Sequence, residues 1–262
     1  MQGPVIAALY RHPVKGFSPE ILQSAELIAG KAFPCDRLFA VEDGPSGFDI
    51  SAPRHISKMR FAVLARSARL ARLGTHYEAD TGVFCVTLPD DAKHEFNLLE
   101  LSGREAFAAF LADYLTPDFK GRLNVLQTVG DHRFMDHHSG DISILNLASL
   151  RALSDQLGQD ISPLRFRMNI HLDGLEAWSE DALQPGARFQ LGAAELEVVS
   201  PTRRCKATHA NPVTGDYDLD LVPELRRHFD RVTLGFYARV IKSGTVSVCD
   251  DFRVGDAQVS DD

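Results

Sequence analysis

The chain has 262 residues, of which 44% are hydrophobic and 24% are charged, and its formal net charge at pH 7 is −8. These values are typical of a globular protein with a sizeable core, and the acidic balance argues against broad nucleic-acid binding and against docking on anionic lipid. No apolar run approaches the roughly 20 residues of a membrane span, and the N-terminus lacks the regions of a signal peptide, so we expect a cytoplasmic protein that does not bind membranes.

The N-terminal part of the chain is predicted to form strands separated by turns. The first strand lies in PVIAALYRHPVKG (residues 4–16), and both DRLFAVEDG (36–44) and GVFCVTLPDD (82–91) are apolar stretches that end in an Asp-containing turn. Residues 58–80 permit two interpretations, a basic amphipathic helix or a strand with alternating burial around residues 61–65.

Two helices are predicted from caps and apolar spacing. Ser102 followed by Glu105 has the spacing of a capping box, and Pro117 ends the helix that would follow. The second helix is expected over residues 145–157, with leucines on one face and Gly158 in the C′ position.

The chain returns to strands after these helices. The predicted strands lie in RFRMNIHLDG (165–174), ARFQLGAAELEVVSP (187–201) and GFYARVIKSGTVSVCDDFRV (235–254). We therefore predict a mainly β protein with a few helices, divided into two β-rich domains at residues 1–122 and 123–262.

One cysteine differs from the others in its surroundings. Cys205 follows Arg203 and Arg204, and cationic neighbours favour the thiolate form, whereas Cys35, Cys85 and Cys249 have the apolar or aromatic neighbours of buried, inert thiols. The absence of a Cys-x-x-Cys pair argues against a thiolate-only zinc site or iron–sulfur cluster. Chemistry alone leaves three interpretations of Cys205: a metal ligand, a nucleophile or sulfur carrier, or an incidental thiol.

Two further groups of polar residues are candidate binding sites. The segment GDHRFMDHHSGD (130–141) contains potential zinc ligands, but their spacing differs from that of helical zinc motifs and favours a polar loop; these residues are Asp131, His132, Asp136, His137 and His138. Separate cations next to turns or within strands suit surface charges or, where buried, oxyanion binding; these are Lys15, Arg37, Arg165 and Arg167.

Taken together, the motifs resemble those of the MOSC family, named after the C-terminal part of molybdenum cofactor sulfurase, preceded by that family's N-terminal β-barrel domain. The resemblance rests on LYRHPVKG (9–16), DRLFAVEDG (36–44), RFRMNI (165–170), the cysteine motif PTRRCKAT…NPVTG (201–215) and GTVSVCDDF (244–252). It covers nearly the whole chain and is greatest to the amidoxime-reducing type of MOSC protein and its bacterial counterparts.

The resemblance implies two β-barrel-like domains with a molybdenum cofactor (molybdenum bound to molybdopterin) between them. Cys205 would be the catalytic residue and the protein ligand to molybdenum. The cofactor-binding residues implied are Lys15, Gly16, Arg37, His138, Ser139, Arg167, Asn169, Arg204 and Cys205.

The resemblance also implies an oxidoreductase that reduces N-oxygenated (N-hydroxylated) small molecules. Electrons would come from a separate flavin- or haem-containing protein. The alternative is a sulfur or molybdenum-cofactor carrier, similar to a sulfurase, that holds a persulfide on Cys205.

Overall fold

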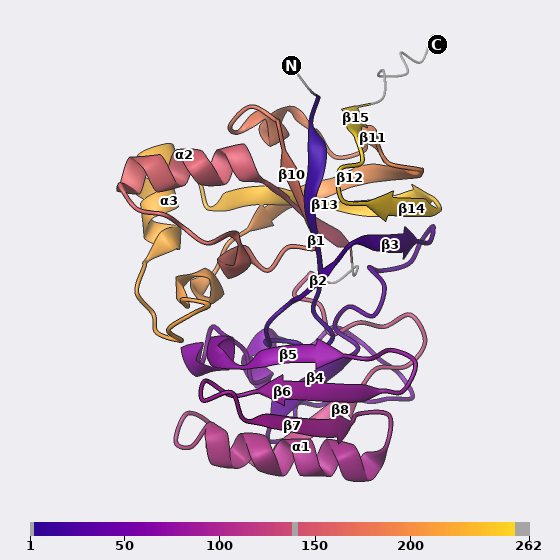
Figure 1. Cartoon of the computed structure of the whole chain (residues 1–262), viewed down its shortest axis with the longest axis vertical. Coiled ribbons are helices and arrows are strands. Elements are labelled where there is room, and N and C mark those ends of the chain that lie inside the picture. The colour runs from indigo at the N-terminus through magenta and orange to yellow at the C-terminus, as the bar shows by residue number, and fades with distance from the viewer. Residues whose placement is uncertain (1–2, 138–140, 255–262) are drawn as a thin grey trace.

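The computed structural model describes residues 3–137 and 141–254, and Figure 1 shows them as two halves stacked along the long axis of the molecule. The strands are β1 (Val5–Arg11), β2 (Glu20–Leu22), β3 (Ser24–Leu27), β4 (Phe39–Asp43), β5 (Gly74–Tyr77), β6 (Val83–Thr87), β7 (Lys93–Asn97), β8 (Leu123–Gln127), β9 (Ile142–Asn146), β10 (Ile170–Asp173), β11 (Arg188–Leu191), β12 (Ala194–Arg203), β13 (Thr233–Lys242), β14 (Gly244–Ser247) and β15 (Phe252–Val254). The α-helices are α1 (Leu101–Tyr114), α2 (Leu147–Leu157) and α3 (Leu221–Phe229), and short 3-10 helices are η1 (Lys58–Arg60), η2 (Ala68–Arg72), η3 (Pro163–Phe166), η4 (Ser179–Ala182) and η5 (Lys206–His209). The prediction of a mainly β fold with a few helices is confirmed.

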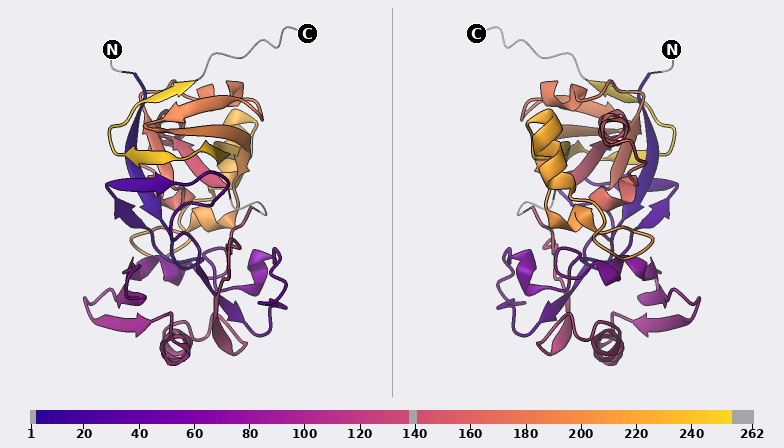
Figure 2. Two further views of the ribbon diagram at one scale, coloured as in Figure 1. Left: turned by 90° about the vertical axis from the view of Figure 1, so that its right-hand side faces the viewer. Right: turned by 90° about the vertical axis from the view of Figure 1, so that its left-hand side faces the viewer.

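One half is built on a large curled sheet with the strand order β15-β11-β12-β13-β9-β10-β1-β2. The sheet bends back on itself, because Ile6 N donates to Asp250 O at 2.9 Å and Phe252 N donates to Pro4 O at 2.8 Å. These bonds join the start of β1 to the chain around β15, the opposite edge of the sheet. A register shift in β1 between Ile6 and Ala8 accompanies the bend, as expected of a bulge. Figure 2 shows the resulting half-barrel from two sides.

The interior of the curled sheet follows the two-residue period of its strands. In β12, the buried residues Ala194, Leu196 and Val198 alternate with Glu195 and Glu197, which remain partly exposed. The buried side chains pack with those of β13 and with β3, which pairs with β14 over residues 24–27 and 244–247. This alternation is what the sequence predicts for strands with one face in the core.

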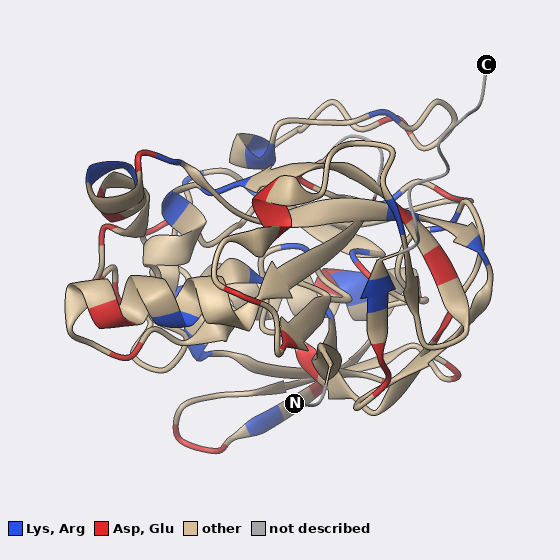
Figure 3. Cartoon of the chain, turned by 90° about the horizontal axis from the view of Figure 1, so that it is seen from above, with Lys and Arg blue, Asp and Glu red and all other residues tan. Residues whose placement is uncertain are grey.

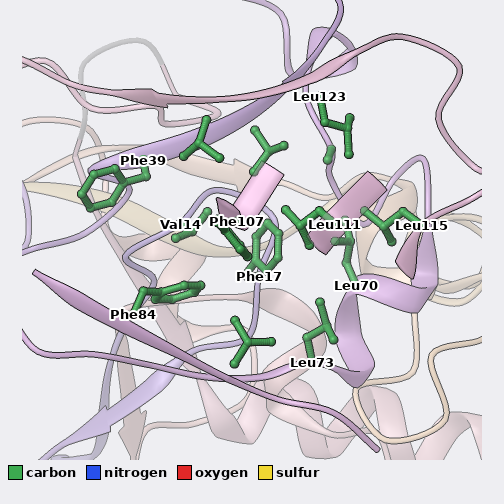
Figure 4. Packing of buried hydrophobic residues seen from close by; sticks show 14 of the residues in the cluster. Val14, Phe17, Phe39, Leu70, Leu73, Phe84, Phe107, Leu111, Leu115 and Leu123 are labelled. Carbon is green, nitrogen blue, oxygen red and sulfur yellow. The ribbon is translucent and has the colours of Figure 1, made fainter. Parts of the chain in front are cut away.

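The other half contains the pair β4–β8, the sheet β5-β6-β7 and helix α1. Its core is rich in aromatic side chains, shown in Figure 4, where the ring of Phe107 lies 5.6 Å from that of Phe17 and 5.3 Å from that of Phe84, measured between centroids. Phe17 and Val14 belong to the turn between β1 and β2. Because both are buried, they fix the turn that carries Lys15 and Gly16.

Helix α1 begins differently from the prediction. It starts at Leu101 with Glu100 at the N-cap, and no side chain caps its backbone, so the predicted capping box at Ser102 and Glu105 is wrong. Ser102 lies inside the first turn, because burial of residues such as Phe107 and Leu111 against β7 and β8 sets the helix limits. The helix ends before Pro117, as predicted.

Helix α2 confirms the second predicted helix, although residue 145 belongs to β9. The side chain of Asn146 accepts a hydrogen bond from Ala148 N at the start, and Gly158 adopts a left-handed conformation with φ 64° at the end. Helix α3 was not predicted. Its apolar face is narrow, with Leu221 and Leu225 buried, and it packs with α2 beside the large sheet.

Residues 58–80 form neither of the two predicted alternatives. They contain η1, η2 and strand β5, joined by irregular chain, with Phe61 bridging Glu42. Only η2 of the two 3-10 turns buries side chains, those of Ala68 and Leu70, and at five residues it is too short to be an amphipathic helix.

Backbone pairing crosses the predicted boundary at residue 122 in both directions. Strands β1 and β2 lie in the large sheet with later strands, whereas β8, which follows the boundary, pairs with β4. The domain limits 1–122 and 123–262 therefore stay a prediction.

Acidic and basic residues are interspersed over the face seen in Figure 3. Among the described residues, every helix is too short or too polar to cross a membrane.

Candidate functional site

A cavity lies where the two halves meet. Both halves contribute side chains to it, and its lining includes residues from the β1–β2 turn, η1, η3, the end of β12 and β13. The lining residues are Lys15, Gly16, Arg37, Lys58, Val63, Leu64, Ala65, Met135, Asp136, His137, Ser143, Arg165, Phe166, Arg167, Met168, Arg204, Cys205, Ala207, Thr208 and Tyr237.

Cys205 lies at the point where β12 ends and η5 begins. Its carbonyl oxygen accepts from Thr208 N and from Thr208 Oγ1, both at 3.0 Å, so its backbone is tied to the first turn of η5. The thiol faces the cavity, and Lys58 Nζ approaches its sulfur at 3.0 Å. Lys58 is therefore a positively charged neighbour in direct contact with this sulfur.

Asp136 pairs with two lysines in the cavity. Lys15 is buried and donates to Asp136 Oδ1 and, at 2.8 Å, to Phe134 O, while Lys58 Nζ lies 3.6 Å from Asp136 Oδ2. Burial favours the neutral carboxyl, but Lys15 and Lys58 outweigh it and hold the pKa of Asp136 well below its usual range. Burial lowers the pKa of Lys15, with Asp136 acting in the opposite direction. For Lys58, Asp136 and Cys205 outweigh burial and raise the pKa.

Arg37 and Arg167 are held by unusual backbone geometry. Both are non-glycine residues in the left-handed region, with φ of 48° and 55°. Asp36, which is fully buried, pairs with the Arg37 guanidinium and accepts from His12 N at 2.6 Å. Arg167 donates to Phe17 O at 2.5 Å. Burial, followed by the like charge of Arg37, lowers the pKa of Arg167 to about 9. Two non-glycine residues in this strained conformation at one cavity suggest a functional constraint.

Arg204 and Arg165 differ in how far their guanidinium groups are satisfied. Arg204 donates weakly to Phe166 O at 3.4 Å and to Met168 Sδ at 3.2 Å, and its buried Nε has no partner. The Nε of Arg165 also has no partner, but its terminal nitrogens donate to His209 O at 3.0 Å and to Asp218 Oδ2 at 2.8 Å and are used inside the protein. Arg204 therefore has N–H donors that could bind an acceptor in the cavity, whereas most of the donors of Arg165 are already used.

Gly16 shapes the wall next to Lys15. Its φ is 91°, and a Cβ at this position would lie 2.5 Å from Ala62 O. The backbone therefore approaches the segment after η1 more closely than any other residue would allow. This contact brings the lysine turn against the chain that carries Lys58.

The predicted site residues do not all reach the cavity. Lys15, Gly16, Arg37, Arg167, Arg204 and Cys205 line it, but Asn169 does not. Asn169 is fully buried, where its Oδ1 accepts from Ser143 Oγ at 2.8 Å and its Nδ2 donates to Tyr10 O at 3.2 Å. It thereby ties β9 to β1 beneath the site. His138 and Ser139 lie outside the described residues.

The remaining candidates for a zinc site are spread out. His132 packs against Phe134, with 5.4 Å between ring centroids, whereas His137 stacks on Tyr237 at 4.5 Å and its Nδ1 lies 2.9 Å from Asp141 Oδ2. Within residues 3–137 and 141–254, no three His, Cys, Asp or Glu side chains form a group that could hold a metal ion. The polar-loop interpretation of this segment agrees with these positions.

Several residues of the cavity lining were not identified from the sequence, among them Lys58, Asp136 and Tyr237. Lys58 falls in the ambiguous segment 58–80, Asp136 was considered only as a metal ligand, and Tyr237 lies in an apolar strand without a motif. The signal at Lys58 is a lysine that follows an irregular polar stretch. Such a signal is too common on protein surfaces to identify a site.

The charges and donors of the cavity suit an anion bound next to a soft metal. Among the described lining residues, six are cations and only Asp136 carries a carboxylate; the cations are Lys15, Arg37, Lys58, Arg165, Arg167 and Arg204. Outside the lining, Asp36 pairs with Arg37 and Asp218 with Arg165. Arg204 has only long contacts to neutral acceptors, Phe166 O and Met168 Sδ, and its Nε has no partner. A thiolate is a soft ligand, and guanidinium groups bind phosphate oxygens. The residues therefore fit a phosphate-bearing metal cofactor.

Several known proteins are similar to parts of this chain. The protein called molybdenum cofactor sulfurase is 29% identical over 119 residues in Caenorhabditis briggsae, covering 44% of this chain and 16% of that protein. The Caenorhabditis elegans protein of the same name is 33% identical over 100 residues, covering 37% of this chain and 14% of that protein. The chain thus spans about one sixth of the length of these relatives.

Solved structures and two family models also match this chain. The YUAD protein of Bacillus subtilis is 14% identical with a TM-score of 0.49, over 98% of each chain, and YiiM of Geobacillus stearothermophilus is 20% identical with a TM-score of 0.36, over 45% of this chain and 56% of that one. Residues 3–117 match the family model of the MOSC N-terminal beta barrel domain, and residues 131–256 match that of the MOSC domain. The chain belongs to the MOSC family, with the N-terminal β-barrel domain of that family preceding the MOSC domain.

Proposed function

We propose that this chain binds a molybdenum cofactor in the cavity between its halves and reduces N-hydroxylated small molecules with electrons from a separate flavin- or haem-containing protein. The observation that carries the proposal is the placement of the Cys205 thiol in a cavity lined by six Lys and Arg side chains, one of which, Lys58, lies 3.0 Å from the sulfur. Both the family and the names of the curated relatives support the choice of molybdenum cofactor.

In this proposal, five residues of the cavity bind the cofactor. Cys205 supplies the thiolate ligand to the metal, while Arg204 and Arg167 bind the phosphate and pterin oxygens with donors that the protein leaves available. Arg37 and Lys15 add positive charge on the side of the N-terminal half. When bound, the cofactor would supply two-electron redox and oxygen-transfer chemistry, which no side chain of the cavity can perform.

The overall reaction sets what the protein must provide. Reduction of a hydroxylamine breaks its N–O bond and consumes two electrons and two protons, giving an amine and water. The electrons come from the donor protein. The cavity must therefore admit both a small substrate and protons, and its open rim at Asp136, half of whose side chain is exposed, gives access from solvent.

A second function is favoured by a different observation. The curated relatives are named molybdenum cofactor sulfurase, and a cysteine beside a cation also suits a sulfur or cofactor carrier that holds a persulfide on Cys205. A carrier would show labile sulfane sulfur and little stably bound metal. The oxidoreductase would show the reverse.

The test is the molybdenum and pterin content of protein purified from a host that makes the cofactor. We expect near-stoichiometric molybdenum in the wild type, loss of most of it in Cys205→Ala, and retention in the control Cys85→Ala, whose thiol lies in β6 away from the cavity lining. Loaded protein is then assayed for benzamidoxime reduction with flavin and haem donor proteins.

The outcomes separate the candidates. Wild-type protein without metal or pterin contradicts cofactor binding, and cyanide-labile sulfur on Cys205 would then favour the carrier. Equal molybdenum in wild type and Cys205→Ala contradicts the ligand assignment alone.

A further inference from the structure

Lys58 is the residue of the N-terminal half that touches Cys205. It is the first residue of η1, and its side chain is 29% exposed at the rim of the cavity. Its Nζ lies 3.0 Å from Cys205 Sγ, across 147 positions of sequence. The contact therefore exists only because the two halves pack together.

Asp136 holds the Lys58 ammonium group next to the Cys205 sulfur. Asp136 Oδ2 lies 3.6 Å from Lys58 Nζ, and the other oxygen of the same carboxylate pairs with Lys15, whose own position is fixed by a 2.8 Å bond to Phe134 O. An ammonium group carries three N–H donors, so it can address the carboxylate and the sulfur together. A long surface lysine would otherwise sample many rotamers.

The other cations of the cavity are directed elsewhere. Arg167 donates to Phe17 O, Arg37 to Asp36 and to Arg167 O, and Arg204 to Phe166 O and Met168 Sδ. In the described part of the chain, Lys58 is the side chain whose donor reaches the Cys205 sulfur. Hydrogen bonds to a ligating sulfur withdraw electron density from it and are among the main protein influences on a bound metal.

We propose that Lys58, oriented by Asp136, is a positioning residue that donates a hydrogen bond to the Cys205 sulfur. This bond holds the sulfur toward the cavity in the cofactor-free protein and withdraws electron density from it when the sulfur ligates a metal. The part that concerns a bound metal rests on the proposed function, whereas the cofactor-free part does not.

The first experiment uses cofactor-free protein. The rate of alkylation of Cys205 by iodoacetamide at pH 7 is measured by peptide mass spectrometry for wild type, Lys58→Met, Lys58→Arg and Lys31→Met. Lys31→Met is the matched control, because it removes an equal charge from a lysine that pairs with Asp131 outside the cavity lining. We expect slower alkylation of Cys205 in Lys58→Met, because the sulfur loses the donor that holds it toward the cavity and its side chain gains rotamer freedom.

The second experiment uses loaded protein. The midpoint potential of bound molybdenum is measured by redox titration followed by electron paramagnetic resonance, after molybdenum content has been matched between variants. Loss of the positive donor makes the reduced state less favourable. A tenfold change in the ratio of reduced to oxidised metal corresponds to a fall of about 59 mV for a one-electron couple.

The expected pattern is slower alkylation and a lower potential in Lys58→Met, near wild-type values in Lys58→Arg, and no change in Lys31→Met. Wild-type alkylation of Cys205 in Lys58→Met overturns the proposal. A lowered rate with an unchanged potential overturns its extension to the bound metal. If the wild type binds no molybdenum, the proposed function fails, but the alkylation series still decides whether Lys58 acts on the sulfur.

Discussion

The guanidinium of Arg37 donates to the backbone carbonyl of Arg167 at 3.1 Å and so joins the two halves of the molecule inside the cavity. Each arginine adopts a left-handed backbone conformation. The two like charges lie close together: burial is the main cause of the lowered pKa of Arg167, and the charge of Arg37 is the next. The fold thus holds cations together that would repel each other without an anion. This relationship leads to predictions about stability, pH and anion binding.

Arg204 and Arg165 are predicted to separate anion binding from stability. We expect inorganic pyrophosphate to raise the Tm of the cofactor-free protein, because binding to the folded state stabilises it by RT ln(1 + [L]/Kd), or about 1.4 kcal/mol at ten times Kd. Arg204→Gln should abolish most of this rise, because the Arg204 guanidinium makes only long contacts to neutral acceptors inside the protein. Arg165→Gln should keep the rise but lower the starting Tm, because Asp218 loses its arginine partner. Differential scanning calorimetry measures both quantities. An equal rise in Arg204→Gln would contradict the assignment.

Removal of the buried carboxylate of Asp36 should destabilise the protein by about 3–5 kcal/mol, the usual cost of breaking a buried pair. Asp36→Asn leaves Arg37 without its main counter-charge, and urea unfolding at pH 7 measures the loss. Burial opposes the charge on Asp36, but Arg37 and His12 hold its pKa below the ordinary value. As the pH falls, this carboxylate takes up a proton in the unfolded chain at a higher pH than in the folded protein. Its contribution to the free energy of unfolding is therefore fully present above about pH 4 and is lost as the pH falls below it. Asp36→Asn should flatten that acid limb.

His171 should make stability depend on pH over a higher range. Burial in β10, next to Tyr10, lowers the pKa of His171 to about 4. The unfolded state binds a proton near pH 6.5, so the free energy of unfolding should fall by roughly 3 kcal/mol from this residue alone as the pH falls from 6.5 to 4. His171→Gln does not titrate. A difference between wild type and variant that stays constant over this range would contradict the prediction.

Gly16→Ala should destabilise the lysine turn by more than conformational strain alone. At φ 91°, a side chain costs roughly 1–3 kcal/mol, and its Cβ would lie 2.5 Å from Ala62 O as well. Gly30→Ala is the matched control, because Gly30 has φ 72° with nothing within 4 Å of an added Cβ, and about 1 kcal/mol is expected there. Chemical denaturation compares the two variants. Equal losses would show that close contact with the backbone after η1 is unimportant.

Local patterns predicted some elements well and others poorly. Helix α2 followed from its leucine spacing and Gly158, because both the cap and the apolar face are local properties. The start of α1 was misplaced, because packing of residues such as Phe107 outweighs a favourable Ser102–Glu105 spacing. Helix α3 was missed, because only Leu221 and Leu225 of its nine residues are buried.

The amino-acid sequence was sufficient to predict a mainly β chain, the family, and six cavity residues that include Cys205, Arg204 and Lys15, because each lies in a short motif with recognisable neighbours. It did not predict the Lys58–Cys205 and Arg37–Arg167 contacts, the second of which spans 130 positions of sequence. It also did not reveal that Asn169 lies beneath the cavity rather than in its wall. Packing of the two halves against each other creates the first two contacts, and pairing of strands in the large sheet buries Asn169. Because the free energy of such contacts depends on burial and distance rather than on neighbouring residues, local sequence carries no signal for them.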